Sequence, residues 1–249
     1  MLLAQAGRTA LPPGQGAVHR DLVYGTAGGR DLLLDLYLPA RPRGPAPVVV
    51  RIHGGGWRNG SKDRRPAVPL AGHGYAVASV GYRLSGEAIF PAQIQDCKAA
   101  IRWLRAHSSK CGLDAGHFAV WGSSAGGHLA ALVGTSGDAR DLEGEAGNPA
   151  ESSRGQAVVD YFGPTDFLRM DDFPGKLRHN APNSAESLVI GGPILENREK
   201  VARANPISYV SADDPPFLIV HGDQDPLAPL NQSELLRDAL EKAGVPVRL

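Results

Sequence analysis

The chain has 249 residues, of which 42% are hydrophobic and 21% are charged, values that suit one globular domain with a sizeable core. Lys and Arg together number 26, as do Asp and Glu, so the net positive charge typical of nucleic-acid-binding proteins is absent. No apolar run approaches the roughly 18 residues that cross a bilayer, and we expect no membrane partner.

Residues 1–19 contain too little apolar sequence for an intact secretion signal, which leaves the cellular compartment open. We expect these residues to be a disordered leader or an added segment without fold information. Cys97 and Cys111 are separated by a predicted helix, and that distance favours free thiols over a disulfide.

Strands and helices alternate along the rest of the chain. Apolar and β-branched runs predict strands over residues 31–39, 46–56, 74–84, 117–122, 155–163, 215–222 and from 245 onward. Helical spacing predicts helices over residues 90–112 and 231–244, and another directly after the strand at 117–122. This alternation predicts an α/β fold with a doubly wound, mostly parallel sheet.

Two stretches have weaker periodicity. Residues 138–154 are polar and contain Gly and Pro, so they predict a surface loop. Residues 164–214 lie between two predicted strands, and we expect short helices over the top of the sheet, as a cap-like insertion. No linker divides the chain, which predicts a single domain over residues 1–249.

Two adjacent serines lie between a predicted strand and a predicted helix. Ser124 has Gly122 and Gly126 two positions away on either side, whereas Ser123 has no glycine at those positions. A tight strand-to-helix turn needs glycine at both places, so Ser124 is the candidate nucleophile. The alternative is an ordinary Gly/Ser turn at a helix N-terminus.

A glycine-bearing loop follows the strand that starts at residue 46. Its sequence HGGGW covers residues 53–57, and consecutive glycines let backbone N–H groups turn toward a ligand. We expect Gly54 and Gly55, with Ala125 after the candidate nucleophile, to donate to a tetrahedral oxyanion. For His53 we expect hydrogen bonds that orient this loop.

Motifs in a fixed order carry a family resemblance: RDLLLDLYLP, HGGGW, GYRLS, FPAQIQDCKAAIRWLR, WGSSAGG, DYFGPTDF and PPFLIVHGDQDPLAP. The chain resembles the α/β-hydrolase esterases and lipases of the hormone-sensitive-lipase-like group, most closely the bacterial acetyl-xylan and feruloyl esterases. The resemblance implies an α/β-hydrolase fold and a Ser–His–Asp triad. It also implies that no metal or organic cofactor is needed.

The resemblance also assigns the acid of the triad. In the pattern His-Gly-x-x-Asp the second acidic position is the triad member, which implies Asp225, while Asp223 is expected in the turn. No histidine of the chain matches the family's catalytic histidine, which we expect beyond Leu249. We therefore expect the last strand to be cut short, with the remaining strand, the histidine loop and the final helix missing, and the 249-residue chain alone to be nearly inactive.

These observations predict a serine carboxylesterase that hydrolyses short-chain acyl or plant cell-wall (acetyl or feruloyl) esters through an acyl-enzyme. The substrate would be a small-molecule or polysaccharide-linked ester. The alternatives are an aryl-formamide or amide hydrolase on the same scaffold, and a non-catalytic binding protein with this fold. Trp57 and Tyr82 are candidates to line the substrate cleft, with core packing as the alternative. The acyl and alcohol preferences and the oligomeric state stay open.

Overall fold

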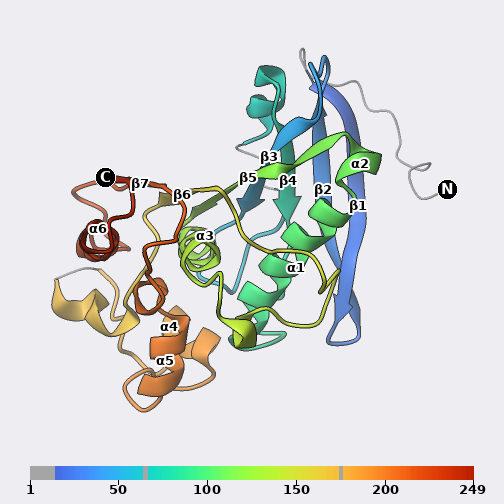
Figure 1. Cartoon of the computed structure of the whole chain (residues 1–249). Coiled ribbons are helices and arrows are strands. Elements are labelled where there is room, and N and C mark those ends of the chain that lie inside the picture. The colour runs from blue at the N-terminus through green and yellow to red at the C-terminus, as the bar shows by residue number, and fades with distance from the viewer. Residues whose placement is uncertain (1–14, 64–66, 174–175) are drawn as a thin grey trace.

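The computed structural model describes residues 15–63, 67–173 and 176–249. Its strands are β1 (Gln15–Ala27), β2 (Arg30–Pro39), β3 (Ala46–Ile52), β4 (Ala76–Val80), β5 (Leu113–Ser123), β6 (Ala157–Tyr161), β7 (Phe217–Val220) and β8 (Val247–Arg248). They form one 8-stranded sheet in the order β1-β2-β4-β3-β5-β6-β7-β8 (Figure 1).

The sheet is mixed at one side and parallel over the rest. β1 and β2 pair antiparallel, as do β2 and β4, whereas every pair from β4–β3 to β7–β8 is parallel. Each parallel strand starts at the same end of the sheet, so the chain must cross back along a face of the sheet between strands. Helices make these crossings and cover the sheet. The predicted doubly wound, mostly parallel sheet is confirmed. The adjacent strands β3 and β5 bring the loops at their carboxyl ends together.

The helices lie on both faces and beyond the carboxyl ends of the strands. They are α1 (Ala92–Ala106), α2 (Ser108–Cys111), α3 (Ala125–Thr135), α4 (Ala185–Ile190), α5 (Arg198–Ala204) and α6 (Asn231–Lys242), with the short 3-10 helices η1 (Val68–His73), η2 (Arg140–Leu142), η3 (Phe167–Asp172) and η4 (Pro206–Ser208). Figure 1 shows α1 and α3 side by side on one face, and α4 and α5 past the strand ends. None of the helices in the described ranges has the length and apolar character of a membrane span.

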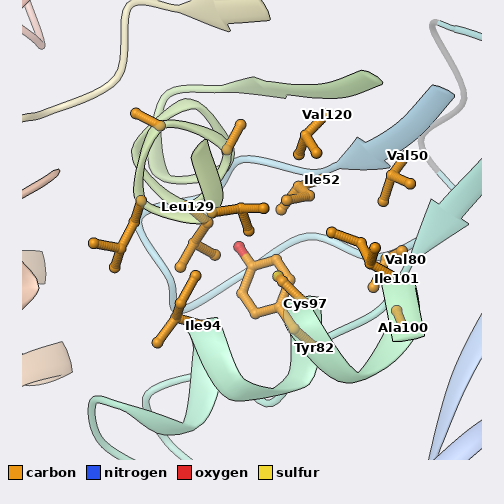
Figure 2. Packing of buried hydrophobic residues seen from close by; sticks show 14 of the residues in the cluster. Val50, Ile52, Val80, Tyr82, Ile94, Cys97, Ala100, Ile101, Val120 and Leu129 are labelled. Carbon is orange, nitrogen blue, oxygen red and sulfur yellow. The ribbon is translucent and has the colours of Figure 1, made fainter. Parts of the chain in front are cut away.

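The main core lies between the sheet and the helices α1 and α3. Ile94, Cys97 and Ile101 follow one another at helical spacing on α1 and are fully buried. Figure 2 shows them facing Val50 and Ile52 of β3. Burying each large aliphatic side chain contributes roughly 1.5–3 kcal/mol relative to leaving it in water, so this face fixes α1 on the sheet.

The structure differs from the sequence prediction at the N-terminal strand β1 and at the end of helix α1. Residues 15–19 belong to β1, so the predicted leader is wrong there, while residues 1–14 lie outside the described residues. Register shifts break the pairing of β1 with β2, which explains why β1 has no regular alternation.

The predicted helix over residues 90–112 is interrupted at His107, where φ is −102° and ψ is 9°. Cys97 and Cys111 are free, as predicted.

Candidate active site

Ser124 occupies a strained turn between β5 and α3. Its φ of 55° and ψ of −125° are unusual for a residue with a side chain. A Cβ on Gly122 would lie 1.8 Å from the Gly126 carbonyl oxygen, and a Cβ on Gly126 would lie 2.3 Å from the Ile52 oxygen. Only glycine fits at these two positions. We call residues 122–128 the elbow.

Backbone hydrogen bonds hold the elbow in place. The Ser124 N–H donates to the Tyr161 carbonyl of β6 at 2.8 Å, and the His128 N–H donates to the Ser124 carbonyl at 2.9 Å. The neighbouring Ser123 side chain is engaged elsewhere, because its Oγ accepts from Arg51 Nη2 at 2.9 Å. Of the two serines, Ser124 is therefore the one at the apex of the turn.

Of the residues predicted to donate to an oxyanion, Gly54 and Ala125 lie directly beside Ser124. A Cβ on Gly54 would be 3.4 Å from Ser124 Cβ, so the loop after β3 packs directly against the elbow. Gly55 has a φ of 123°, and its carbonyl accepts from Arg58 N at 3.1 Å, which closes a tight turn. Ala125 is the first residue of α3, so its N–H has no acceptor within the helix. The positive end of the α3 dipole points at the same place.

Trp57 and Tyr82 are core residues. They are 1% and 2% exposed, and of the two alternatives in the sequence the structure shows core packing. Tyr82 Oη donates to the His53 carbonyl at 3.0 Å, and its ring stacks on the His53 imidazole with centroids 4.3 Å apart. Figure 2 shows the Tyr82 ring against Cys97 of α1. Both aromatic residues therefore support the glycine loop from inside the protein.

A buried imidazole connects the glycine loop to the elbow. Trp57 Nε1 donates to His128 Nδ1 at 3.2 Å, and His128 Nε2 lies 2.7 Å from the Ala204 carbonyl, to which it donates. Burial lowers the pKa of His128 to about 4, although the bond to the Ala204 carbonyl opposes this shift. His128 is therefore neutral at pH 7, with its proton on Nε2.

Asp225 lies in the loop after β7, residues 221–228, which we call the acid loop. Its Oδ1 accepts from Leu227 N at 2.8 Å and from Ala228 N at 3.0 Å, and the side chain is 20% exposed. Its Oδ2 lies 3.9 Å from His221 Nε2, a distance too long for a hydrogen bond. One carboxylate oxygen is thus fixed by the loop itself, while Asp223 is exposed in the turn.

Four buried imidazoles lie near these loops, and each bonds to other groups. His53 Nδ1 donates to the Gly54 carbonyl, and His128 bonds to Trp57 and Ala204.

The other two imidazoles lie on the acid side of the site. His221 donates through Nε2 to the Ala228 carbonyl at 2.9 Å and accepts through Nδ1 from Ser233. His179 bonds to Glu186 at 2.9 Å. None of these bonds reaches Ser124, so the predicted origin of the catalytic histidine stays a prediction.

Asp160 is a residue of the site that the sequence did not single out. It is fully buried at the end of β6, and its Oδ1 accepts from Gly163 N at 2.9 Å. A Cβ on Gly127 would be only 2.3 Å from this oxygen, so the carboxyl packs against the first turn of α3. Burial raises the pKa of Asp160 to about 7, against the lowering effect of the Gly163 N–H. Within β6, Val158 and Asp160 are the buried residues, so the carboxyl shares the inward face of the strand with Val158, which the apolar run in the sequence did not reveal.

Metal-binding side chains do not gather in the described residues: no group of three or more His, Cys, Asp or Glu there could hold a metal ion. The chemistry that the site offers is a serine hydroxyl at a helix N-terminus beside a glycine loop. This arrangement suits nucleophilic attack on a carbonyl carbon.

The BD-FAE family model matches residues 34–240, which include the glycine loop, the elbow and the acid loop. The chain belongs to the BD-FAE family. The resemblance to esterases of the hormone-sensitive-lipase-like group is thereby confirmed. The BD-FAE match covers most of the chain and both sides of the elbow.

Curated relatives agree with the family match. The chain is 34% identical over 232 residues to the probable carboxylic ester hydrolase LipM of Mycobacterium tuberculosis. The aligned region covers 90% of this chain and 52% of LipM. The chain thus spans about half the length of the curated relatives it matches first. These names favour neither the formamidase nor the non-catalytic alternative.

Solved structures confirm that this BD-FAE member has the α/β-hydrolase fold of esterases. A truncated carbohydrate esterase from gut microbiota superimposes with a TM-score of 0.86 at 33% identity, covering 94% of this chain and 86% of that one. An acetyl ester-xyloside bifunctional hydrolase from Caldicellulosiruptor lactoaceticus does so with a TM-score of 0.72 at 28% identity, covering 88% and 76%.

Proposed function

We propose that the protein containing this chain is a serine carboxylesterase in which Ser124 is the nucleophile. The observation that carries the proposal is the strained elbow, which presents Ser124 at the N-terminus of α3 with Gly54 packed against it. A hydroxyl at such a position can attack a carbonyl while backbone N–H groups receive the developing negative charge.

The reaction follows from this placement. Ser124 Oγ bonds to the ester carbonyl carbon and its proton passes to an imidazole, while the carbonyl oxygen becomes an oxyanion facing the N–H groups of Gly54, Gly55 and Ala125. The C–O bond to the alcohol then breaks, and the alcohol leaves with the proton. Water releases the acid from the acyl-enzyme by the same steps. One oxyanion donor is worth about 3 kcal/mol of transition-state stabilisation.

We propose Asp225 as the group that orients the imidazole and stabilises its positive charge. Its Oδ1 is occupied by the acid loop, and Oδ2 is the oxygen left to accept from an imidazole N–H. We propose that this imidazole comes from outside the 249 residues, since the buried histidines at these loops are engaged with other partners.

The proposed substrates are esters with short acyl groups, including acetyl or feruloyl groups on plant polysaccharides. The similarity to a hydrolase named for acetyl esters and xylosides supports this range. The test is a set of p-nitrophenyl esters of increasing acyl length, with methyl ferulate, acetylated xylan and an aryl formamide, assayed on the whole protein. Hydrolysis of the formamide without any ester would overturn the proposal.

Covalent labelling tests the nucleophile separately. An organophosphate should modify Ser124 of the whole protein, and mass spectrometry should locate the adduct on that residue. An adduct on Ser123, or labelling that persists in Ser124→Ala, would contradict the assignment.

A further inference from the structure

A buried histidine–carboxylate pair lies in the segment of short helices between β6 and β7. His179 Nδ1 is 2.9 Å from Glu186 Oε1, and each side chain is only 6% exposed. Burial lowers the pKa of His179, but the bond to Glu186 and the charges of Glu186 and Asp171 raise it more, so the net direction is upward. A buried carboxylate needs a hydrogen-bond donor, and the imidazole supplies one to Glu186 here.

The backbone around His179 is fixed as well. The Asp171 carboxylate accepts from His179 N at 3.0 Å and from Asn180 N at 2.9 Å. Glu186 lies in the first turn of α4, which Ser184 caps by accepting from Ser187 N. The imidazole therefore has a defined position and orientation.

The other side of the imidazole meets the acid loop. The Leu227 backbone lies close enough to His179 to raise the pKa of the imidazole, as a carbonyl acceptor does. Lys176 N donates to the preceding carbonyl, that of Pro226, at 3.2 Å. The segment between β6 and β7 thus holds two consecutive carbonyls of the acid loop.

The same two peptide units bind the proposed catalytic acid. The N–H that follows the Pro226 carbonyl belongs to Leu227, and the N–H that follows the Leu227 carbonyl belongs to Ala228. Both donate to Asp225 Oδ1, at 2.8 and 3.0 Å. Because a peptide unit is planar and rigid, fixing its carbonyl also fixes its N–H. One peptide unit therefore separates His179 from the proposed catalytic acid.

The pair also adjoins the glycine loop. A Cβ on Gly56 would lie 3.3 Å from Ala185 Cβ, so the start of α4 is in contact with that loop. Glu186 is the next residue. The segment therefore spans from the oxyanion side of the site to the acid side, with the His179–Glu186 pair between them.

We propose that His179 and Glu186 are a positioning pair that fixes the direction of the Asp225 carboxylate through the Leu227–Ala228 peptide unit. This inference rests on the proposed function, in which Asp225 orients the catalytic imidazole. His179 touches neither substrate nor reacting atoms in this role. Its contribution is the orientation of the acid.

The main test replaces His179 by Phe in the whole protein. We expect kcat for p-nitrophenyl acetate to fall about 10- to 100-fold with KM within about twofold, because small misplacements of a catalytic group cost rates of this order. Amide hydrogen exchange should accelerate at residues 223–228 and stay unchanged at residues 125–135. The matched control is His117→Phe, since His117 forms an exposed pair with Asp114 at 2.8 Å, and we expect no change there.

Two results would overturn the proposal. One is a folded His179→Phe protein with unchanged kcat. The other is equal acceleration of exchange in residues 223–228 and 125–135, which would mean general loosening. If His179→Phe does not fold, Glu186→Met decides by the same criteria, because it removes the acceptor of His179 Nδ1 and nearly retains the side-chain volume.

The exchange measurement needs no substrate, which separates this inference from the proposed function. If the whole wild-type protein hydrolyses no ester, the proposed function fails. Selective acceleration at residues 223–228 would still support the pair as the support of the acid loop, and its absence would overturn it.

Discussion

The elbow and the acid loop hold their functional side chains by different means. In the elbow, backbone bonds and contacts that only glycine allows set the position of Ser124. In the acid loop, two backbone N–H groups bind Asp225 Oδ1, and Lys176 N and His179 from the segment between β6 and β7 contact the carbonyls of the same peptide units. The residues that form the elbow thus lie within a stretch of seven, 122–128, although their contacts reach β3 and β6. The acid loop also depends on side chains of a segment about 50 residues away.

The sharpest test of the elbow removes its hydroxyl. Ser124→Ala should lower kcat/KM for p-nitrophenyl acetate in the whole protein by about 10⁶-fold, because no other group can form the acyl-enzyme. Ser123→Ala is the matched control and should retain activity, since its Oγ bonds to Arg51. Comparable losses in both variants would contradict the distinction between the two serines.

The acid loop is tested by changing its carboxylates one at a time. Asp225→Asn should lower kcat about 10⁴-fold with little change in KM, because the amide cannot stabilise an imidazolium. Asp223→Asn should have a small effect, as this side chain is exposed in the turn. The opposite ranking in steady-state kinetics would exchange the two roles.

A stability measurement tests whether backbone contacts alone build the elbow. Gly122→Ala should lower the free energy of unfolding by about 4 kcal/mol or more, because the added Cβ would collide with the Gly126 carbonyl. Gly86→Ala is the control, since a Cβ there would meet nothing within 4 Å. Urea unfolding of both variants gives the comparison, and equal stabilities would show that the elbow can relax.

The two regions should also respond to pH in opposite directions. His128, at the elbow, has a folded-state pKa lowered from 6.5 to about 4, so the unfolded chain binds more protons between these values. Stability from this group is lost as the pH falls, by about 3 kcal/mol in total. His179, at the acid loop, has a raised pKa, so its contribution is present below pH 6.5 and is lost as the pH rises through the folded-state pKa.

Urea unfolding from pH 4 to pH 8 measures both contributions. His128→Asn should flatten the acid side of the stability profile, because an amide does not titrate. His179→Gln should flatten the side above pH 6.5. Profiles identical to that of the wild type would mean that neither imidazole has the shifted pKa.

The sequence predicted the elbow better than the acid loop, because a local pattern marks the elbow whereas none marks the support of the acid loop. Gly-Ser-Ser-Ala-Gly between a buried strand and a helix is a local pattern, and so is HGGGW. The link from His179 to Leu227 joins residues 48 positions apart, and no local pattern marks it. The sequence also could not decide whether Trp57 lines a cleft or packs in the core, because its hydrogen-bond partner His128 is 71 positions away.

The left-handed backbone at Ser124 limits which nucleophiles this scaffold could carry. A β-branched side chain is a strong outlier at a φ of 55°, so threonine is excluded although its hydroxyl chemistry is equivalent. Cysteine has the unbranched shape of serine and meets the same steric requirement. An exchange of nucleophile during evolution or engineering is therefore open toward a thiol and closed toward a secondary alcohol.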